Sequence, residues 1–280
     1  MIEHVYRRTA AAPGVDAVVV AADDERIVRA VEAFGGVATL TRSTHRTGTD
    51  RVAEVAERLD CAVILNVQGD EPFVEPEMLA DLAAPLLRDP GVVMTTLRRA
   101  ITDPADYTNP HVVKVVVDCA GDALYFSRAP LPYRRPETLD APSPANAPQA
   151  TAWHHIGLYG FRRDVLLRFS ALPQTPLELS ESLEQLRALE HGIAIRTIPT
   201  QYESIGVDTL DDLDRARRRM SALTARGGSL AAFTGRCIPA GCVAPHSHTP
   251  GMLGRRALPA GRLARLDATP YFHRGLLAHA

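Results

Sequence analysis

The chain has 280 residues, of which 46% are hydrophobic and 23% charged, a composition typical of folded globular domains and unlike that of disordered chains. Its net charge of −2 supplies no overall positive field to attract nucleic acid. The apolar runs are far shorter than a membrane span, and the first residues lack the pattern of a signal peptide. The four cysteines are too few and too scattered for a disulfide framework. We therefore expect a cytoplasmic protein that works without nucleic acid or a membrane.

Short apolar runs alternate with helical patterns from residue 1 to about residue 220. The first half predicts, in chain order, a helix over 2–12, a strand over 16–22, a helix begun by the acids at 23–25, a strand over 37–40, a helix over 49–59, a strand over 61–67 and a helix from residue 76. The second half predicts strands over 92–97, 112–117, 124–127 and 153–161, a helix over 180–191, a strand over 193–198 and a helix from 209 to about 223.

This alternation predicts an α/β fold with a mostly parallel, doubly wound sheet and helices on both faces. Residues 130–148 are rich in proline and alanine, which favours an exposed loop. Residues 226–280 are dense in Gly, Pro, Ala, Arg and His and show no lasting period. We therefore expect a domain over 1–225 and a separate, disordered tail over 226–280.

The strongest polar motif is the stretch Asn66-Val67-Gln68-Gly69-Asp70-Glu71-Pro72, where an apolar strand leads directly into an amide, a glycine and two acids. Asp70 would lie at the carboxyl edge of the sheet, where a hard cation and a triphosphate could meet. Gly69 allows the backbone to approach a ligand closely. The alternative is an ordinary turn, because Gly-Asp is common turn chemistry.

Two further motifs precede helices. Asp208, just before the last predicted helix, is a candidate second carboxylate on the same cation, and the alternative is helix capping. Residues 41–51 place small hydroxyls, Gly48 and arginines at a helix start, whose free N–H groups can hold an anion or a base carbonyl. This stretch is not a Walker loop, and an ordinary capped helix start explains it equally well. Arg128 and His155 are candidates for holding a carboxylated or polyhydroxylated substrate, although such residues more often serve packing or the surface.

Together these motifs resemble the 3-deoxy-manno-octulosonate (Kdo) cytidylyltransferases, also called CMP-Kdo synthetases. The resemblance covers residues 1 to about 220, and its matching stretches are THRTGTDR, NVQGDEP, NPHVVKVVVD, ALYFSRAPLPY, HHIGLYGFR, PLELSESLEQLR and GVDTLDDLDR. It implies a Rossmann-like nucleotidyltransferase that joins Kdo to CTP, giving CMP-Kdo and pyrophosphate for lipopolysaccharide biosynthesis.

The resemblance also implies roles for particular residues. Asp70 and Asp208 would be the catalytic magnesium ligands, which makes Mg²⁺ the expected cofactor. Thr47, Gly48 and Thr49, where the family usually has Ser-Gly-Thr, would hold the nucleotide together with Arg51. The residues expected to line the sugar side are Gln68, Arg128, His155, Tyr159, Glu184 and Gln185. The partners would be CTP, Kdo and a second copy of the chain, contacting through residues 123–133.

The sequence departs from that family pattern at its beginning and in the tail over 226–280. The family opens with a strand and a basic loop that cradles the triphosphate, whereas this sequence begins where the family has the following helix. We therefore expect a sheet that lacks a central strand, with unpaired edges beside the gap, and little or no turnover. The alternative function is an inactive remnant that binds sugar or nucleotide.

Two other functions fit the sequence poorly. In the tail, Cys237, Cys242, His246 and His248 do not have zinc-finger spacing. The absence of Gly-x-Gly-x-x-Gly after an early strand argues against a dehydrogenase.

Overall fold

The computed structural model describes residues 1–133, 152–203, 206–207, 209–225 and 274–279. The strands are β1 (Ala17–Ala22), β2 (Ala38–Leu40), β3 (Val63–Gln68), β4 (Met94–Ala100), β5 (Lys114–Val117), β6 (Ala123–Ser127), β7 (Trp153–Arg162), β8 (Arg196–Pro199) and β9 (Arg274–His279). The helices are α1 (Ile2–Ala10), α2 (Glu25–Ala33), α3 (Gly48–Ala56), α4 (Pro76–Arg88), α5 (Pro104–Thr108), α7 (Arg163–Ser170), α8 (Pro176–Glu181), α9 (Gln185–Glu190) and α10 (Leu210–Ala225).

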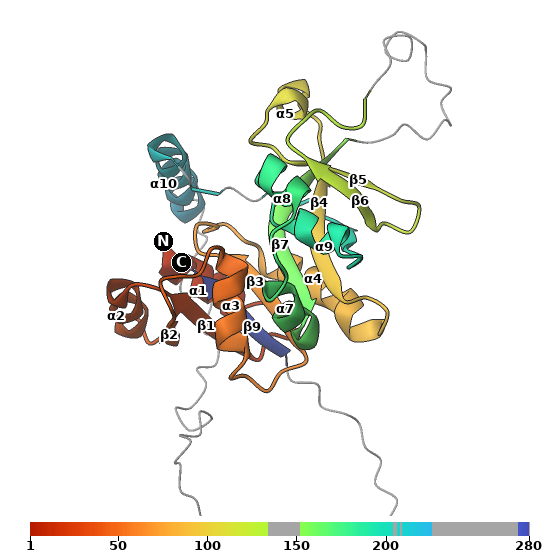
Figure 1. Ribbon diagram of the computed structural model, residues 1–280. Helices are drawn as coiled ribbons and strands as arrows, with labels where there is room; N and C mark the ends of the chain where they lie inside the picture. The colour runs from red at the N-terminus through yellow and green to blue at the C-terminus, as the bar shows by residue number, and fades with distance from the viewer. Residues whose placement is uncertain (134–151, 204–205, 208, 226–273, 280) are drawn as a thin grey trace, which may run out of the picture.

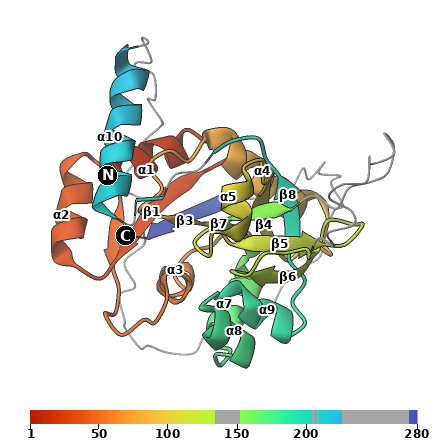
Figure 2. The ribbon, with the colours of Figure 1, turned by 90° about the horizontal axis from the view of Figure 1, so that it is seen from above.

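One sheet contains all these strands, in the order β2-β1-β9-β3-β7-β4-β8, and the hairpin of β5 and β6 joins it through the antiparallel pairing of β5 with β7 (Figures 1 and 2). The expected α/β class is confirmed. The sheet is mixed, because β7 runs antiparallel to both β3 and β4, whereas β1, β9 and β3 run parallel to one another. The parallel half, next to α1, α2 and α3, provides the carboxyl edge at which a ligand site was expected.

The two faces of the sheet carry separate hydrophobic cores, because neighbouring residues of a strand point to opposite faces. Ile64 of β3 belongs to the core under α3 and α7. Val63, Leu65 and Val67 of the same strand belong to the core under α1 and α4. Helices therefore cover both faces, as the sequence predicts.

The centre of the sheet departs from the expected arrangement. The position between β1 and β3 is occupied by β9, which pairs in parallel with both strands. The expectation of unpaired edges beside a missing central strand is therefore wrong. The expectation of a tail separate from the domain is wrong for Arg274–His279, while residues 226–273 and 280 lie outside the described part of the chain. The apolar run 275–278 is too short for its periodicity to distinguish a strand from tail sequence, and its pairing is non-local.

The helix expected over 180–191 is two helices, α8 and α9. Ser182 between them has a φ of 52°, a left-handed conformation that stops an α-helix. The helices α5 and α7 were not anticipated. The residues expected to form an exposed loop, 134–148 in particular, lie outside the described residues. Within the described ranges, no helix is both long and apolar enough to cross a bilayer.

Candidate functional site

The carboxyl edge of the parallel strands holds a cavity of about 640 Å³. Its polar lining comes from two strand ends, Gln68, Gly69 and Asp70 after β3, and Asp24 and Arg26 after β1. The Asp24 side chain caps α2 by accepting from the Arg26 N–H at 2.7 Å, and it also receives the Arg26 guanidinium. These hydrogen bonds lower the pKa of Asp24 to about 2. From the sequence this acidic turn is expected only as a cap, and Arg26 is not among the expected site residues, although the strand-end rule that singles out Asp70 applies to it equally.

Asp70 lies beside the chain segment that carries the second expected metal ligand. The backbone N–H of Val207 donates to the Asp70 carbonyl oxygen at 3.0 Å. A Cβ atom built on Gly206 would lie 3.7 Å from a carboxylate oxygen of Glu71. Asp208 itself lies outside the described residues, so the distance between its carboxylate and that of Asp70 stays a prediction.

The start of α3 is a capped helix start, which is the alternative that the sequence left open, with Thr47 as the N-cap. Its hydroxyl accepts from the Asp50 N–H at 3.2 Å, which satisfies one of the free donors of the first turn. Thr49 is buried and accepts from the Asn66 amide of β3 at 3.0 Å. This contact fixes the Thr47-Gly48-Thr49 turn against the strand that ends in Gln68.

Glu184, just before α9, approaches this turn from the other half of the fold. The Thr47 hydroxyl donates to the Glu184 carboxylate at 3.3 Å. Burial raises the pKa of Glu184 to about 7, and a hydrogen bond from Thr49 opposes that rise only in part. The structure therefore joins residues expected on the nucleotide side to a residue expected on the sugar side, and it gives that carboxyl a pKa near neutrality.

His155 of β7 contacts two of the other expected site residues, Gln185 and Tyr159. Its Nε2 lies 2.9 Å from the Thr96 hydroxyl, and its Nδ1 lies 3.5 Å from the Gln185 amide nitrogen. Its ring packs edge-on against Phe126 and at a tilt against Tyr159. Burial lowers the pKa of His155 to about 3, so the ring is neutral and works here as a hydrogen-bonding spacer between β4 and α9.

Two arginines from the expected site are bound within the protein. Arg51 donates to Thr41 at 2.8 Å and to Asp23 at 2.7 Å, which ties α3 to the turn after β1. The Arg128 guanidinium donates to the backbone carbonyls of Glu181, Pro110 and Ser182. Arg128 therefore holds the end of α8 against the hairpin. Its guanidinium is bound to backbone carbonyls, so it would act on the proposed sugar side only by positioning α8.

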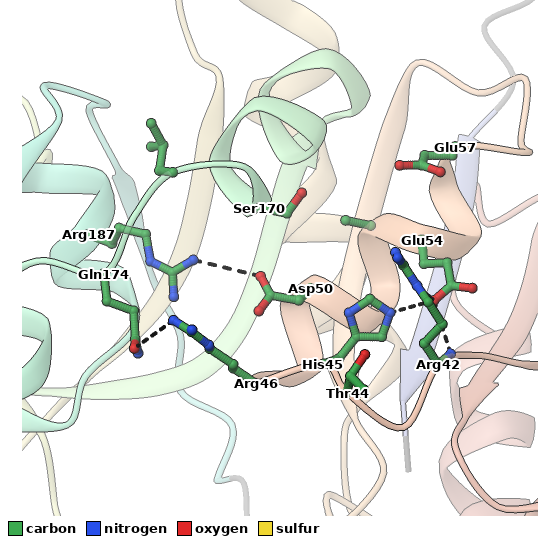
Figure 3. Close-up of a pocket in the computed structure, with 12 residues that line it drawn as sticks. Arg42, Thr44, His45, Arg46, Asp50, Glu54, Glu57, Ser170, Gln174 and Arg187 are labelled. Atoms are coloured by element: carbon green, nitrogen blue, oxygen red, sulfur yellow. Dashed lines mark hydrogen bonds and ion pairs between the residues drawn. The ribbon is translucent and has the colours of Figure 1, made fainter.

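A second cavity, of about 300 Å³, lies on the flank of α3 (Figure 3). Asp50 and Arg187 point toward each other across it, 3.7 Å apart, and Arg46 reaches Gln174. The residues that line it are Arg42, Thr44, His45, Arg46, Asp50, Ala53, Glu54, Glu57, Ser170, Leu172, Gln174 and Arg187. It adjoins the Thr47 turn, and five of its lining residues come from the stretch 41–51, but Thr47, Gly48, Thr49 and Arg51 do not line it.

In the described part of the chain, no group of three or more metal-ligating side chains is already assembled. Cys237, Cys242, His246 and His248 lie outside those residues. The single lysine, Lys114, is buried in β5 and donates to the carbonyls of Asn109, Val112 and Arg128 at 2.6–2.8 Å. It is consequently a structural residue and not a phosphate ligand.

Comparison with known proteins connects this geometry to a family. The family model described as cytidylyltransferase matches residues 1–198. The 3-deoxy-manno-octulosonate cytidylyltransferase of Pelobacter propionicus is 52% identical over 227 residues, covering 81% of this chain and 89% of the relative. The enzyme of the same name from Geobacter metallireducens is 52% identical over 222 residues, covering 79% and 87%.

A solved structure of a protein with a related name also matches this chain. A structure described as CMP:2-keto-3-deoxy-manno-octonic acid synthetase complexed with CTP superposes with a TM-score of 0.71 at 43% identity. That match covers 79% of this chain and 87% of the other. The 4-diphosphocytidyl-2C-methyl-D-erythritol synthase of Anaerococcus prevotii, at 12% identity and a TM-score of 0.50, shares the fold alone.

Proposed function

The chain belongs to the cytidylyltransferase family, and we propose that it transfers the cytidylyl group of CTP to Kdo, releasing pyrophosphate and forming CMP-Kdo for lipopolysaccharide biosynthesis. The observation that carries this proposal is the contact between the Thr47 hydroxyl and Glu184. It places the turn expected to hold the nucleotide against the helix expected to hold the sugar. Two reactants bound on either side of that contact would be close enough to react, and such positioning is much of what a nucleotidyltransferase contributes.

In the proposed reaction the anomeric hydroxyl of Kdo attacks the α-phosphorus of CTP, its proton is lost, and pyrophosphate leaves. Glu184 is the candidate acceptor for that proton, because a carboxyl with a pKa of about 7 is well matched to proton transfer at neutral pH. Gln185 follows Glu184 in the chain, and His155 holds its side-chain amide. Tyr159 also packs on His155, so these residues would orient the sugar. Arg26 adds positive charge at the edge cavity where the phosphates would lie.

The residues at the carboxyl edge fit a magnesium ion. Asp70 follows a buried strand, two residues after its last residue Gln68, and the Val207 contact brings the chain next to Asp208 to the same edge, so the candidate donors are carboxylate oxygens. Mg²⁺ is commonly held by one or two carboxylates together with substrate phosphates. When bound there, Mg²⁺ would neutralise negative charge on the phosphates. We propose Asp70 and Asp208 as its ligands.

A second function is a protein that binds CTP or Kdo without turnover. It is favoured by the charge of the edge cavity, because Arg26 is the basic side chain among the described lining residues and is already bound to Asp24. A triphosphate carries more negative charge than one engaged arginine can offset. The two functions differ in one observable, which is pyrophosphate release.

The proposal includes a homodimer and a cytoplasmic location. Leu124 of β6 is 62% exposed and Tyr133 is 79% exposed, within the stretch 123–133 expected to form the subunit contact. Large apolar side chains on an exposed hairpin favour a subunit interface. A second chain of the same sequence is the partner that we propose for them.

The test is pyrophosphate release from the full chain with CTP, Kdo and Mg²⁺. We expect release that requires all three, and a loss of at least about 100-fold in Asp70→Asn. Asp60→Asn is the matched control, because Asp60 is an exposed carboxylate at the opposite end of β3. Binding of CTP or Kdo by calorimetry without pyrophosphate release would favour the binding protein. Equal activity of the two variants would contradict the role of Asp70.

A further inference from the structure

The hydroxyl of Thr96 in β4 lies among three hydrogen-bonding atoms that belong to β7. It is 2.9 Å from the Leu158 carbonyl oxygen, 3.2 Å from the Ile156 carbonyl oxygen and 2.9 Å from His155 Nε2. We infer that Thr96 is a positioning residue, which fixes the nitrogen of the His155 ring that carries the proton and thereby turns the amide oxygen of Gln185 toward the sugar. This inference rests on the proposed function, which puts Gln185 on the sugar side.

An irregularity in the β4–β7 ladder creates this arrangement. Thr96 pairs with Tyr159, but the next residue of β4 pairs with Ile156, so residues 157 and 158 have no partner in that register. Extra residues in one strand form a β-bulge, which bends the strand and redirects its groups. Thr96, Ile156 and Leu158 are all buried, so their polar groups depend on partners within the protein.

The single proton of the Thr96 hydroxyl determines the tautomer of the ring. A carbonyl oxygen only accepts hydrogen bonds, whereas a nitrogen of a neutral imidazole either donates or accepts. The hydroxyl proton must therefore point toward the two carbonyls, because two oxygens in hydrogen-bond contact attract each other only when a hydrogen lies between them. His155 Nε2 is then the donor to Thr96. Burial lowers the pKa of His155 to about 3, so the ring is neutral and its Nδ1 carries no proton.

The bare Nδ1 in turn orients the Gln185 amide. A nitrogen without a proton only accepts, so the corner of the amide that faces it at 3.5 Å is the NH2 group and not the oxygen. The amide oxygen is turned away from His155, and the described residues supply no hydrogen-bond donor to it. A hydroxyl of the bound sugar is the donor that suits this oxygen.

The direction of the amide determines which group of the sugar Gln185 binds. With its oxygen presented, Gln185 accepts from a hydroxyl, whereas the opposite orientation would present the NH2 group and suit a carboxylate. Kdo carries groups of both kinds. A site built for one hydrogen-bonding pattern rejects a ligand that leaves its buried polar groups unpaired. Thr96 therefore contributes to specificity without contacting the sugar.

The neighbouring threonine provides a matched control. Thr95 is also buried in β4, and its hydroxyl donates to the Leu82 carbonyl oxygen at 2.8 Å. Successive side chains of a strand point to opposite faces, so Thr95 faces α4 whereas Thr96 faces His155. Valine has the shape of threonine without the hydroxyl and suits a strand. Thr95→Val and Thr96→Val each remove one buried hydroxyl from the same strand, so a general loss of stability should be alike in both.

The first experiment measures the nitrogen-15 chemical shifts of the His155 ring in the full chain without substrate. We expect a proton on Nε2 and none on Nδ1 in the parent and in Thr95→Val. In Thr96→Val the proton should move to Nδ1, because Nε2 has lost its acceptor and Nδ1 can donate to the oxygen of a reversed Gln185 amide. A parent ring protonated at Nδ1 would overturn the inference, and so would an unchanged tautomer in Thr96→Val.

The second experiment separates the sugar from the nucleotide. Thr96→Val should raise KM for Kdo about tenfold and leave KM for CTP unchanged, because one hydrogen bond to the sugar is lost. Thr96→Ser keeps the hydroxyl, so it and Thr95→Val should stay within about twofold of the parent. Equal KM values for Kdo in Thr96→Val and Thr95→Val would contradict the role of Thr96.

Failure of the inference and failure of the proposed function give different results. A parent that releases no pyrophosphate contradicts the transfer reaction, and the dissociation constant of Kdo from calorimetry then replaces KM in the same comparison of variants. A parent that does not bind Kdo at all would overturn the orientation of Gln185 toward the sugar. The nitrogen shifts test the tautomer in either case, because they are measured without substrate.

Discussion

Glu184 has a hydrogen-bond partner, but its surroundings disfavour the charged form of its carboxyl. It accepts a hydrogen bond from Thr47, yet burial raises its pKa to about 7. Arg187 favours the ionised form, but burial and the nearby carboxylates of Asp50 and Glu178 oppose it. The carboxyl is therefore near its midpoint at neutral pH, where it can both accept and release a proton.

Replacing Glu184 by glutamine removes its titrating carboxyl, so the difference in stability between the variant and the parent should depend on pH. Its ordinary pKa is 4.5 and its folded-state pKa is about 7, so the unfolded chain loses this proton first as the pH rises. The carboxyl's contribution to stability is therefore complete below about pH 4.5 and is lost as the pH climbs to about 7. We expect the free energy of unfolding of Glu184→Gln, relative to the parent, to increase by about 2 kcal/mol between pH 5 and pH 8.

Urea denaturation at several pH values measures this difference. The control is Glu77→Gln, at an exposed glutamate of α4, for which the difference from the parent should stay flat. A flat profile for Glu184→Gln as well would show that its carboxyl ionises normally in the folded protein. The same variant should release pyrophosphate more slowly if Glu184 accepts the proton of the sugar hydroxyl.

At the scale of elements, the pair α8 and α9 positions Glu184, which we propose for the sugar side of the site. Glu178 closes a capping box at the start of α8 by accepting from the Thr175 N–H at 3.2 Å. It also receives two hydrogen bonds from the Arg187 guanidinium of α9, one of them at 2.8 Å. Arg187 in turn packs over the ring of Phe169 in α7. One buried ion pair thus holds three helices in the order that presents Glu184.

Breaking this pair should cost both stability and sugar binding. Glu178→Ala leaves the Arg187 charge buried without its bidentate partner, so we expect a loss of about 3–5 kcal/mol in the free energy of unfolding. Glu178→Gln keeps an acceptor for Thr175 and Arg187 and should lose less. Denaturant unfolding measures the stability, and steady-state kinetics should show a larger rise in KM for Kdo than for CTP. An equal rise in both would mean that α8 and α9 do not form the sugar side.

At the scale of the whole molecule, the hairpin of β5 and β6 joins the main sheet through the pairing of β5 with β7 (Figure 1). Its Leu124 side chain is exposed. Glu181 of α8 anchors its inner side by accepting from the Ser127 hydroxyl at 2.6 Å and from the Arg128 N–H at 3.0 Å. This anchoring leaves Leu124 facing outward on a rigid support. A fixed apolar surface of this kind is suited to self-association.

Leu124→Asp should therefore dissociate the proposed dimer. A charge placed in an apolar interface loses its hydration without gaining a partner, so dimers should give way to monomers at micromolar concentration. Sedimentation velocity measures the change. Leu210→Asp is the matched control, because Leu210 is 81% exposed at the start of α10, away from the hairpin. A parent chain that sediments as a monomer would contradict the dimer itself.

Local sequence was sufficient to predict much of this protein. The acidic cap before α2, a capped start for α3 and the buried strand that ends in Gln68 all follow from neighbouring residues. The α/β class and the family follow from the order of such segments. These features depend on interactions within a few residues, and the sequence displays such interactions directly.

Tertiary structure decided the features that depend on distant partners. Sequence alone could not show that Arg128 and Lys114 donate to backbone carbonyls, because distant segments complete these contacts, Glu181 for Arg128 and Arg128 for Lys114. Likewise, the pKa of Glu184 depends on burial by elements far along the chain. The central strand is the extreme case, because residues 274–279 pair with β1 and β3, which lie more than 200 positions earlier in the chain. The sequence of a short apolar segment does not indicate which strands it pairs with. That pairing depends on which buried backbone groups would otherwise stay without hydrogen bonds.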